Sequence, residues 1–309
     1  MKNYYRIMLG KKSIYAKEAH EGNYIGAGWF DSVDLTNKLS DNWRDFNKKF
    51  IPIYLEKNPD KTKVSAGLAC GMLYTIAKGI LVGDIVLCPD GSGNYFVGEI
   101  TGDYEYHKGK ILAHRRSVRW YTKTISRSEM SESLRNSAGA IGTVSNISKY
   151  ADEIETLISA GGRPASIIST DETVEDPSVF ALEKHLEDFL VQNWRHTELG
   201  KHYDIYEEDG EMVGQQYPSD TGPIDILAIS KNKKELLIVE LKKGRVSDVV
   251  VGQVQRYMGY VQEELAEKNQ IVKGAIIAFE DDIKINRALS VARNIDFYTY
   301  KIHFELKKK

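Results

Sequence analysis

The stretch GPIDILAISKNKKELLIVELKKG, residues 222–244, decides the fold of the C-terminal half. It contains two apolar runs, residues 224–230 and 235–241, separated by a short polar turn. Runs of this length that are rich in Ile, Leu and Val are typical of strands, and a polar turn between them is typical of a hairpin. The stretch therefore predicts two antiparallel strands in a largely buried sheet.

Three charged residues lie at the ends of these runs. Asp225 is near the start of the first strand and Glu240 near the end of the second, so an antiparallel hairpin brings them together. Glu240 and Lys242 are two positions apart, and side chains two apart in a strand point to the same face. We therefore predict that all three polar groups share one site.

The segments around the hairpin complete an α/β pattern. Residues 177–194 and 247–269 carry apolar side chains at helical spacing. Residues 202–208 and 272–280 look like strands, and the second of these is almost wholly apolar, as expected in a sheet covered on both faces. We predict an α/β C-terminal domain with a mixed sheet flanked by helices.

A site with this composition suits phosphodiester hydrolysis. Two nearby carboxylates repel each other, and a divalent cation relieves that repulsion. Mg²⁺ takes one or two carboxylates, waters and substrate phosphate oxygens as ligands. A lysine beside them can orient a water or stabilise charge that develops on the phosphate. The three residues therefore supply the groups that a metal-dependent nuclease needs.

The residues ID at 224–225 and ELK at 240–242 match the motif of the PD-(D/E)XK nuclease superfamily, which has the restriction-endonuclease-like fold. The stretches GPIDILA, LLIVELKKG and VGQVQRYMGYV together resemble the catalytic domain of NucS-type endonucleases. The resemblance covers residues 177–280, about a third of the chain. The motif alone is weak, but the flanking apolar strands and the following helix make it more specific.

The resemblance implies roles for individual residues of this chain. Asp225 and Glu240 would ligate the metal, and Lys242 would assist the water. Gln253 would hydrogen-bond within the site, and Arg256 would pack or touch backbone phosphates, as would the neighbouring tyrosine. A glutamate on the preceding helix often completes such a metal site.

Two glutamates one helical turn apart are candidates for that last position. The resemblance favours Glu183 and leaves Glu187 as the alternative. It implies Mg²⁺ as the cofactor, with Mn²⁺ expected to substitute. The competing interpretation is that Glu240 and Lys242 form an exposed salt bridge on an edge strand, which would mean little.

The N-terminal half has a different pattern of short strand-like runs and turns. Residues 83–121 contain strand-like runs between Gly-containing turns, which suits an α+β domain with a small curved sheet or barrel. Together with YIGAGWF at residues 24–30, they resemble PUA-like and EVE-like modules, more loosely than the C-terminal half resembles a nuclease. Such modules bind nucleic acid, and several hold a flipped base in an aromatic pocket.

This second resemblance names a set of candidate nucleic-acid-binding or base-binding residues. The aromatic rings are Trp29, Phe30, Tyr104, Tyr106 and Trp120. Asp103 or Glu105 would read the base edge. His114, Arg115 and Arg116 would meet phosphates. The competing interpretation is that aromatic side chains in a small β domain form its core.

Length, charge and composition limit the number of domains and the class of protein. A chain of 309 residues fits two domains, and we place an N-terminal domain at residues 1–158, a linker at 159–178 and the nuclease domain at 179–309. The formal net charge of −2 excludes a globally basic nucleic-acid binder but not a local basic groove. Two isolated cysteines argue against a zinc site. The chain shows neither a membrane-spanning run nor the features of a signal peptide, so we expect a cytoplasmic protein without a membrane partner.

The sequence thus predicts a Mg²⁺-dependent DNA endonuclease whose N-terminal domain selects the substrate. We favour recognition of modified DNA in restriction or anti-phage defence. The alternatives are a NucS-like repair endonuclease acting on mismatched or branched DNA, and a non-catalytic nucleic-acid-binding protein. DNA is the expected partner, and a homodimer is one expected assembly because cutting both strands commonly requires two active sites.

Overall fold

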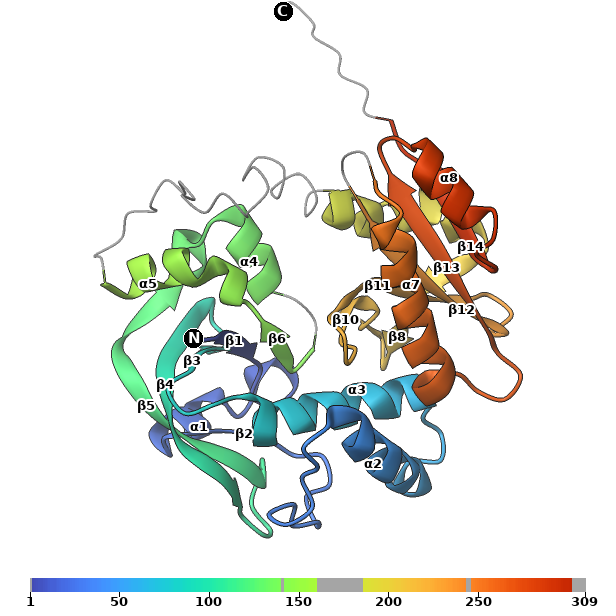
Figure 1. Ribbon diagram of the computed structural model, residues 1–309. Helices are drawn as coiled ribbons and strands as arrows, with labels where there is room; N and C mark the ends of the chain where they lie inside the picture. The colour runs from blue at the N-terminus through green and yellow to red at the C-terminus, as the bar shows by residue number, and fades with distance from the viewer. Residues whose placement is uncertain (1, 140–141, 160–185, 243–245, 302–309) are drawn as a thin grey trace, which may run out of the picture. The chain divides into compact units, whose positions relative to one another are not determined.

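A computed structural model gives the structure of the chain, which folds as two compact units (Figure 1). The described residues are 2–139, 142–159, 186–242 and 246–301. Unit 1 comprises Met1–Lys61 and Ser65–Thr170, and unit 2 comprises Thr62–Val64 and Asp171–Lys309. Apart from residue 159, the predicted linker lies outside the described residues. None of the described helices is both long and apolar enough to cross a membrane.

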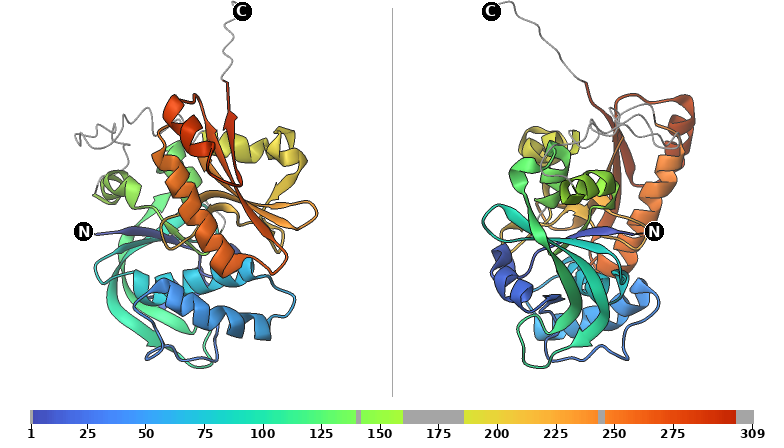
Figure 2. Two further views of the ribbon diagram at one scale, coloured as in Figure 1. Left: turned by 45° about the vertical axis from the view of Figure 1, so that its right-hand side comes forward. Right: turned by 90° about the vertical axis from the view of Figure 1, so that its left-hand side faces the viewer.

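Unit 1 is built on a six-stranded mixed sheet with the order β2-β5-β4-β3-β1-β6. Its strands are β1 (Tyr4–Ile7), β2 (Tyr24–Ala27), β3 (Ile85–Pro89), β4 (Asn94–Tyr106), β5 (His114–Ser126) and β6 (Val144–Asn146). β1 and β3 are parallel and the other pairs are antiparallel. β4 and β5 form a long curved hairpin (Figure 2). The curved sheet is as predicted, but it is open rather than a closed barrel, with β2 and β6 at its two ends among the described strands.

Helices cover both faces of this sheet. They are α1 (Ala16–Glu21), α2 (Trp43–Lys57), α3 (Lys63–Tyr74), α4 (Glu132–Ala138) and α5 (Ala151–Ser159), and α3 continues as a π-helical turn, Thr75–Gly79. One apolar core lies between the sheet and side chains of α1, α2 and α3, including Phe46, Phe50 and Leu73. A second core lies on the other face and includes Leu134 and Ile154. The N-terminal unit thus has an interior on each side of its sheet.

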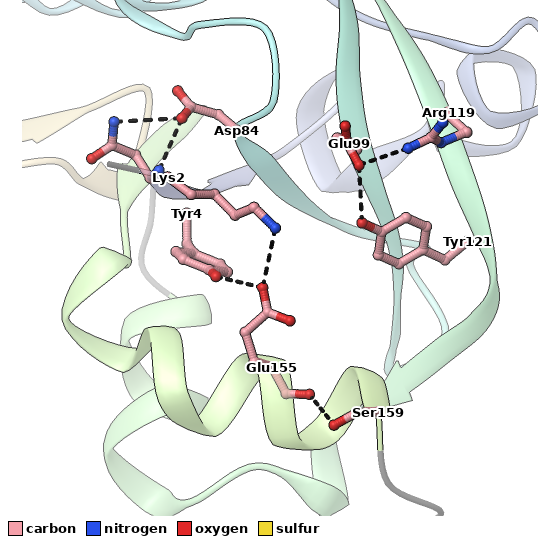
Figure 3. Close-up of polar contacts among 9 residues, drawn as sticks. Lys2, Tyr4, Asp84, Glu99, Arg119, Tyr121, Glu155 and Ser159 are labelled. Atoms are coloured by element: carbon pink, nitrogen blue, oxygen red, sulfur yellow. Dashed lines mark hydrogen bonds and ion pairs between the residues drawn. The ribbon is translucent and has the colours of Figure 1, made fainter.

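Polar contacts fasten α5 to the sheet (Figure 3). The Glu155 carboxylate accepts a hydrogen bond from the Tyr4 hydroxyl at 2.5 Å and forms an ion pair with Lys2 at 3.4 Å. Burial raises the pKa of Tyr4, and the hydrogen bond to Glu155 raises it further, so this phenol remains protonated. Nearby on β4 and β5, Glu99 accepts hydrogen bonds from Arg119 at 2.8 Å and Tyr121 at 3.4 Å. These contacts connect the helix and the strands of unit 1 to one another.

Unit 2 contains the second six-stranded sheet, with β10-β11-β12-β13-β14 as the main order. Its strands are β7 (Tyr203–Ile205), β10 (Gln215–Tyr217), β11 (Ile224–Ser230), β12 (Glu235–Leu241), β13 (Ile271–Ala278) and β14 (Ile295–Thr299), and β7 pairs with β11. A separate two-stranded sheet consists of β8 (Glu207–Glu208) and β9 (Glu211–Met212). β11 and β12 are antiparallel, whereas β12, β13 and β14 run parallel. The predicted hairpin and mixed sheet are confirmed.

Each face of this sheet carries its own apolar layer. α7 (Val249–Tyr260), which ends in the π-helical turn Val261–Leu265, packs on one face together with α8 (Ile283–Leu289) (Figure 2). Val254, Ile276 and Ile285 are fully buried there. The other face packs against the segment around Trp194 and Leu199. Covering on both faces explains why β12 and β13 are almost continuously apolar.

Candidate active site

The β11–β12 hairpin brings together the two carboxylates that the sequence singled out. Ile226 pairs with Val239, so the next step of the antiparallel register places Asp225 opposite Glu240. Asp225 Oδ2 accepts a hydrogen bond from the Leu241 backbone N–H at 2.8 Å. This bond anchors the Asp225 carboxylate to the end of β12.

Glu240 and Lys242 form an ion pair beside this anchor. The distance from Lys242 Nζ to Glu240 Oε1 is 3.0 Å, and the side chains are 33% and 3% exposed, respectively. β12 lies between β11 and β13, so the pair does not belong to an edge strand. The interpretation as an exposed edge-strand salt bridge is therefore excluded. A buried carboxylate is held next to an ammonium group that reaches solvent.

A third carboxylate comes from the helical segment 186–192. Glu187 is buried and accepts hydrogen bonds from two consecutive glutamines of β10. Gln215 Nε2 donates to Glu187 Oε1 at 2.8 Å, and Gln216 Nε2 donates to Glu187 Oε2 at 2.8 Å. Gln216 Nε2 also donates to Asp225 Oδ1, at 3.1 Å. Glu187 thus joins the hairpin carboxylates through Gln216, whereas Glu183 lies outside the described residues.

The two glutamines were not predicted from the sequence. Gln216 adopts a left-handed backbone with φ of 51°, which non-glycine residues seldom do. Neither glutamine follows an apolar period or a motif of the resemblance. Only the structure shows that they lie on a short strand that pairs with β11 around Asp225.

Helix α7 contributes Gln253 and Tyr257 near the carboxylates. Gln253 Nε2 donates to the Tyr257 hydroxyl at 3.3 Å. Burial raises the pKa of Tyr257; the bond from Gln253 lowers it, and the carboxylates Glu240 and Asp225 raise it further. Tyr257 therefore lies within electrostatic reach of both acids. Arg256, the predicted phosphate contact, is exposed on the same helix.

Close packing under Tyr257 constrains the loop before β11. Gly222 has φ of +122°, a conformation that L side chains rarely adopt. A Cβ at this position would lie 3.3 Å from the Tyr257 hydroxyl oxygen. The glycine of the GPID stretch thus lets the chain enter β11 beneath the tyrosine.

The carboxylates fit a hard divalent cation. Over the described part of the chain, no three His, Cys, Asp or Glu side chains come together as a preformed metal cluster. Mg²⁺, however, needs only one or two carboxylates with waters and phosphate oxygens. Glu187 and Asp225 converge on a single amide nitrogen, with Glu240 next to Asp225 in the register. Glu187 and Asp225 are thus held close together, as two ligands of one small cation need to be.

Several predicted nucleic-acid-binding residues of unit 1 lie in its interior instead. Phe30 is buried and packs edge-on against Phe50 and Tyr54. Arg116 is 3% exposed and donates to the carbonyl oxygens of Gly102, Ile76 and Ile80. These two side chains are not placed to stack on a base or to meet a phosphate. Their surroundings agree with the core interpretation.

His114 is also interior, and it connects three segments of unit 1. Its side chain is fully buried, Nδ1 accepts from the Tyr104 hydroxyl at 2.7 Å, and Nε2 donates to the Phe30 carbonyl oxygen at 3.1 Å. The Leu35 N–H donates to the same hydroxyl at 3.3 Å. His114 therefore fastens the loop after β2 to the β4–β5 hairpin and is not available to a phosphate.

The remaining candidates are only partly buried or exposed. The Tyr106 hydroxyl donates to the Asp31 carbonyl oxygen at 2.8 Å, and Asp103 and Glu105 are exposed on β4. Arg115 lies 3.6 Å from the centre of the Tyr24 ring and donates to backbone carbonyls. Trp29 packs partly buried against the first core of unit 1.

Trp120 packs, partly buried, against the same apolar core as Trp29 and Tyr104. It neighbours His20 and Phe96, with ring centroids 5.3 Å and 6.2 Å away. Its cross-strand partner is Gly98, where a Cβ would lie 2.6 Å from the indole ring. The glycine gives the indole room to lie across β4. Four of the five predicted rings thus lie in or against one core, which agrees with the core interpretation.

The buried imidazole predicts a pH-dependent stability of unit 1. Burial lowers the pKa of His114, although backbone hydrogen bonds to Phe30 and Trp29 oppose this. Because the unfolded chain takes up a proton near pH 6.5, the stability contributed by neutral His114 should be present above that pH and be lost as the pH falls below it. Urea unfolding between pH 5 and 8 should show this slope, and it should weaken in His114→Gln. An equal slope in both proteins would contradict the assignment.

Comparison with protein families gives two matches. Residues 5–148 match a family described as a domain of unknown function (DUF8426). Residues 183–308 match the family described as the endonuclease NucS C-terminal domain. The first match gives no support to a PUA-like or EVE-like module, which stays a prediction. No curated protein matches the chain.

Three solved structures show a distant likeness. A repair endonuclease from Pyrococcus abyssi is 14% identical, with a TM-score of 0.31 and coverage of 69% of this chain and 66% of that one. A complex of EndoMS with double-stranded DNA is 11% identical, with a TM-score of 0.32 and coverage of 69% of this chain and 63% of that one. EndoMS in its apo form is 12% identical, with a TM-score of 0.30 and coverage of 69% of this chain and 76% of that one. The chain thus spans slightly less than two thirds of the first two structures. The family match is the more informative comparison: the C-terminal half, with the whole candidate site, is similar to the NucS C-terminal domain.

Proposed function

We propose that this chain is a metal-dependent DNA endonuclease that hydrolyses phosphodiester bonds at the C-terminal site. The observation that carries the proposal is the convergence of Asp225, Glu240 and Lys242 at the end of one hairpin. This convergence lies within the segment that matches the NucS C-terminal domain. A chance D-E-K spacing on an exposed edge would give neither the buried glutamate nor the match.

The acidic residues of the site would bind the cation, and the lysine would act on the attacking water or on the phosphate. Asp225 and Glu240 would hold Mg²⁺ together with a glutamate of the preceding helix, Glu183 or its alternative Glu187, and Mn²⁺ would substitute. The bound ion would polarise the phosphate and lower the pKa of a water. Lys242, with its ammonium at the boundary between Glu240 and solvent, would orient that water or stabilise charge on the phosphate.

Gln253 and Tyr257 would contribute from α7. Their hydrogen bond helps to hold the phenol within electrostatic reach of the carboxylates, and burial raises its pKa, so that it stays protonated. A neutral hydroxyl can donate a hydrogen bond to an anionic phosphate oxygen. Arg256, exposed on the same helix, would contact the DNA backbone at the edge of the site.

For the biological role we keep modified DNA in restriction or anti-phage defence as the proposed target. The alternative role is repair of mismatched or branched DNA. We also keep a homodimer as the proposed assembly for cutting both strands, with unit 1 as the part that selects the substrate.

The test is a cleavage panel with the full-length chain. Mg²⁺ or Mn²⁺ is titrated into reactions with unmodified, methylated, hydroxymethylated, mismatched and branched DNA. We expect cleavage of at least one substrate that requires the metal and stops with EDTA, and the preferred substrate assigns the role. If every substrate stays intact at every metal concentration, the nuclease proposal fails.

A further inference from the structure

One amide group connects the two carboxylates that come from different elements of unit 2. Gln216 Nε2 donates to Glu187 Oε2 at 2.8 Å and to Asp225 Oδ1 at 3.1 Å. A glutamine side chain has two N–H donors, so both are used on two separate acids. Gln215 also reaches Glu187, but its second contact is Asp188 at 3.3 Å. Of the two neighbours, Gln216 is the one that bridges to the β11–β12 hairpin.

The backbone of Gln216 is what allows both glutamines to reach the same carboxylate. Consecutive side chains of a regular strand point to opposite faces. Gln215 and Tyr217 pair with Ile226 and Ile224 of β11, while Gln216 between them is left-handed with φ of 51°. A left-handed backbone is unfavourable for a non-glycine residue. The strand therefore keeps an unfavourable conformation at the position where the amide joins the two acids.

Bridging of this kind affects cation binding. Ligating carboxylates are commonly oriented by hydrogen bonds from residues behind them, and loss of such a partner typically lowers metal affinity about 10–100-fold. Without the amide, the repulsion between the two like-charged groups would lose one of the contacts that oppose it. With it, they stay close enough to share a single hydrogen-bond donor.

We propose that Gln216 is a positioning residue that holds Glu187 and Asp225 together for a divalent cation. The inference rests on the proposed function, because it takes these two acids as metal ligands. It adds a residue outside the D-E-K motif, and it assigns Glu187 to the metal site on the evidence of its contacts.

The test measures Mn²⁺ binding to the full chain by calorimetry without DNA. Gln216→Met keeps the length of the side chain and removes both donors, and we expect Mn²⁺ to bind about 10–100-fold more weakly. Gln216→Gly also removes the donors but suits the left-handed backbone. In EDTA its melting temperature should therefore stay the same or rise, while Mn²⁺ binding falls as in the methionine variant.

Gln215→Met is the matched control. Its two contacts, with Glu187 and Asp188, both lie in the helical segment 186–192, so its effect on Mn²⁺ affinity should be clearly smaller than that of Gln216→Met. Equal losses in both variants, or wild-type affinity in both Gln216 variants, would overturn the role of Gln216. Absence of Mn²⁺ binding by the wild type would instead overturn the proposed function, so the two failures are distinguishable.

Discussion

The Lys242→Met variant is expected to cleave DNA about 10²–10⁴-fold more slowly than the wild type while still binding Mn²⁺. Methionine fills a similar space but carries neither the charge nor the donors of the ammonium group. Glu240 would lose its partner at 3.0 Å but keep its negative charge for the cation. Single-turnover cleavage and calorimetry on the same preparation would separate the loss of chemistry from the loss of metal.

The structure offers a close control for this variant. Lys273 pairs with Glu235 at 2.9 Å, and its side chain has the same 33% exposure as that of Lys242. Glu235 is at the start of β12, whereas Glu240 is near its end. Lys273→Met should therefore cut DNA like the wild type. A similar loss of cleavage in both variants would indicate a general effect on the sheet and would contradict a role for Lys242 in the reaction.

Asp225→Asn is expected to abolish measurable cleavage and to weaken Mn²⁺ binding at least about tenfold. The amide oxygen can still accept the bond from the Leu241 N–H, but the amide nitrogen then faces Gln216 Nε2 and the bond from Gln216 is lost. Removing one negative charge near Glu187 relieves repulsion, whereas losing the bond from Gln216 is unfavourable, so thermal stability in EDTA should change little. Calorimetry with Mn²⁺ and thermal melts in EDTA would measure both effects.

Asp204→Asn provides the comparison for this second variant. Asp204 is exposed on β7, which pairs with the other half of β11. Its replacement removes the same charge from the same sheet, away from the hairpin end that carries Glu240. Retained metal binding in Asp225→Asn, or equal losses in both variants, would show that Asp225 is not a metal ligand.

The hairpin that carries the site was predictable from the sequence. The apolar runs at 224–230 and 235–241 coincide with β11 and β12, because a polar turn and a strand buried on both faces leave a strong local pattern. The antiparallel register then brings Asp225 and Glu240 together without further information. Apolar side chains at helical spacing placed Gln253 on a helix, and the structure confirms that helix as α7.

The glutamine bridge was not predictable, for a physical reason. Whether Gln216 reaches Glu187 and Asp225 depends on a left-handed residue inside a three-residue strand. Glutamine has no special preference for that conformation, which tertiary contacts impose here. Such positions are where local sequence rules are expected to fail.

In unit 1 the strands were predicted from the sequence, but which of their side chains are buried was not. The HRRSVRW stretch was interpreted as a basic surface, yet His114 and Arg116 are interior. Val118 gave a signal, because it shares strand parity with both residues and is itself buried. Arg115 and Arg119, on the opposite parity, are the more exposed side chains. Period-two alternation was thus more informative than the charge of the cluster.

The most direct test of the proposed active site is metal-dependent cleavage by three proteins in parallel. Wild type, Lys273→Met and Lys242→Met are incubated with the DNA panel across a Mg²⁺ titration, and the initial cleavage rates are compared. The predicted result is Mg²⁺-dependent cutting by the first two and a rate lower by about 10²–10⁴-fold in Lys242→Met. Cleavage that does not need the metal, or that proceeds equally well in Lys242→Met, would contradict a metal-dependent nuclease site at the end of this hairpin.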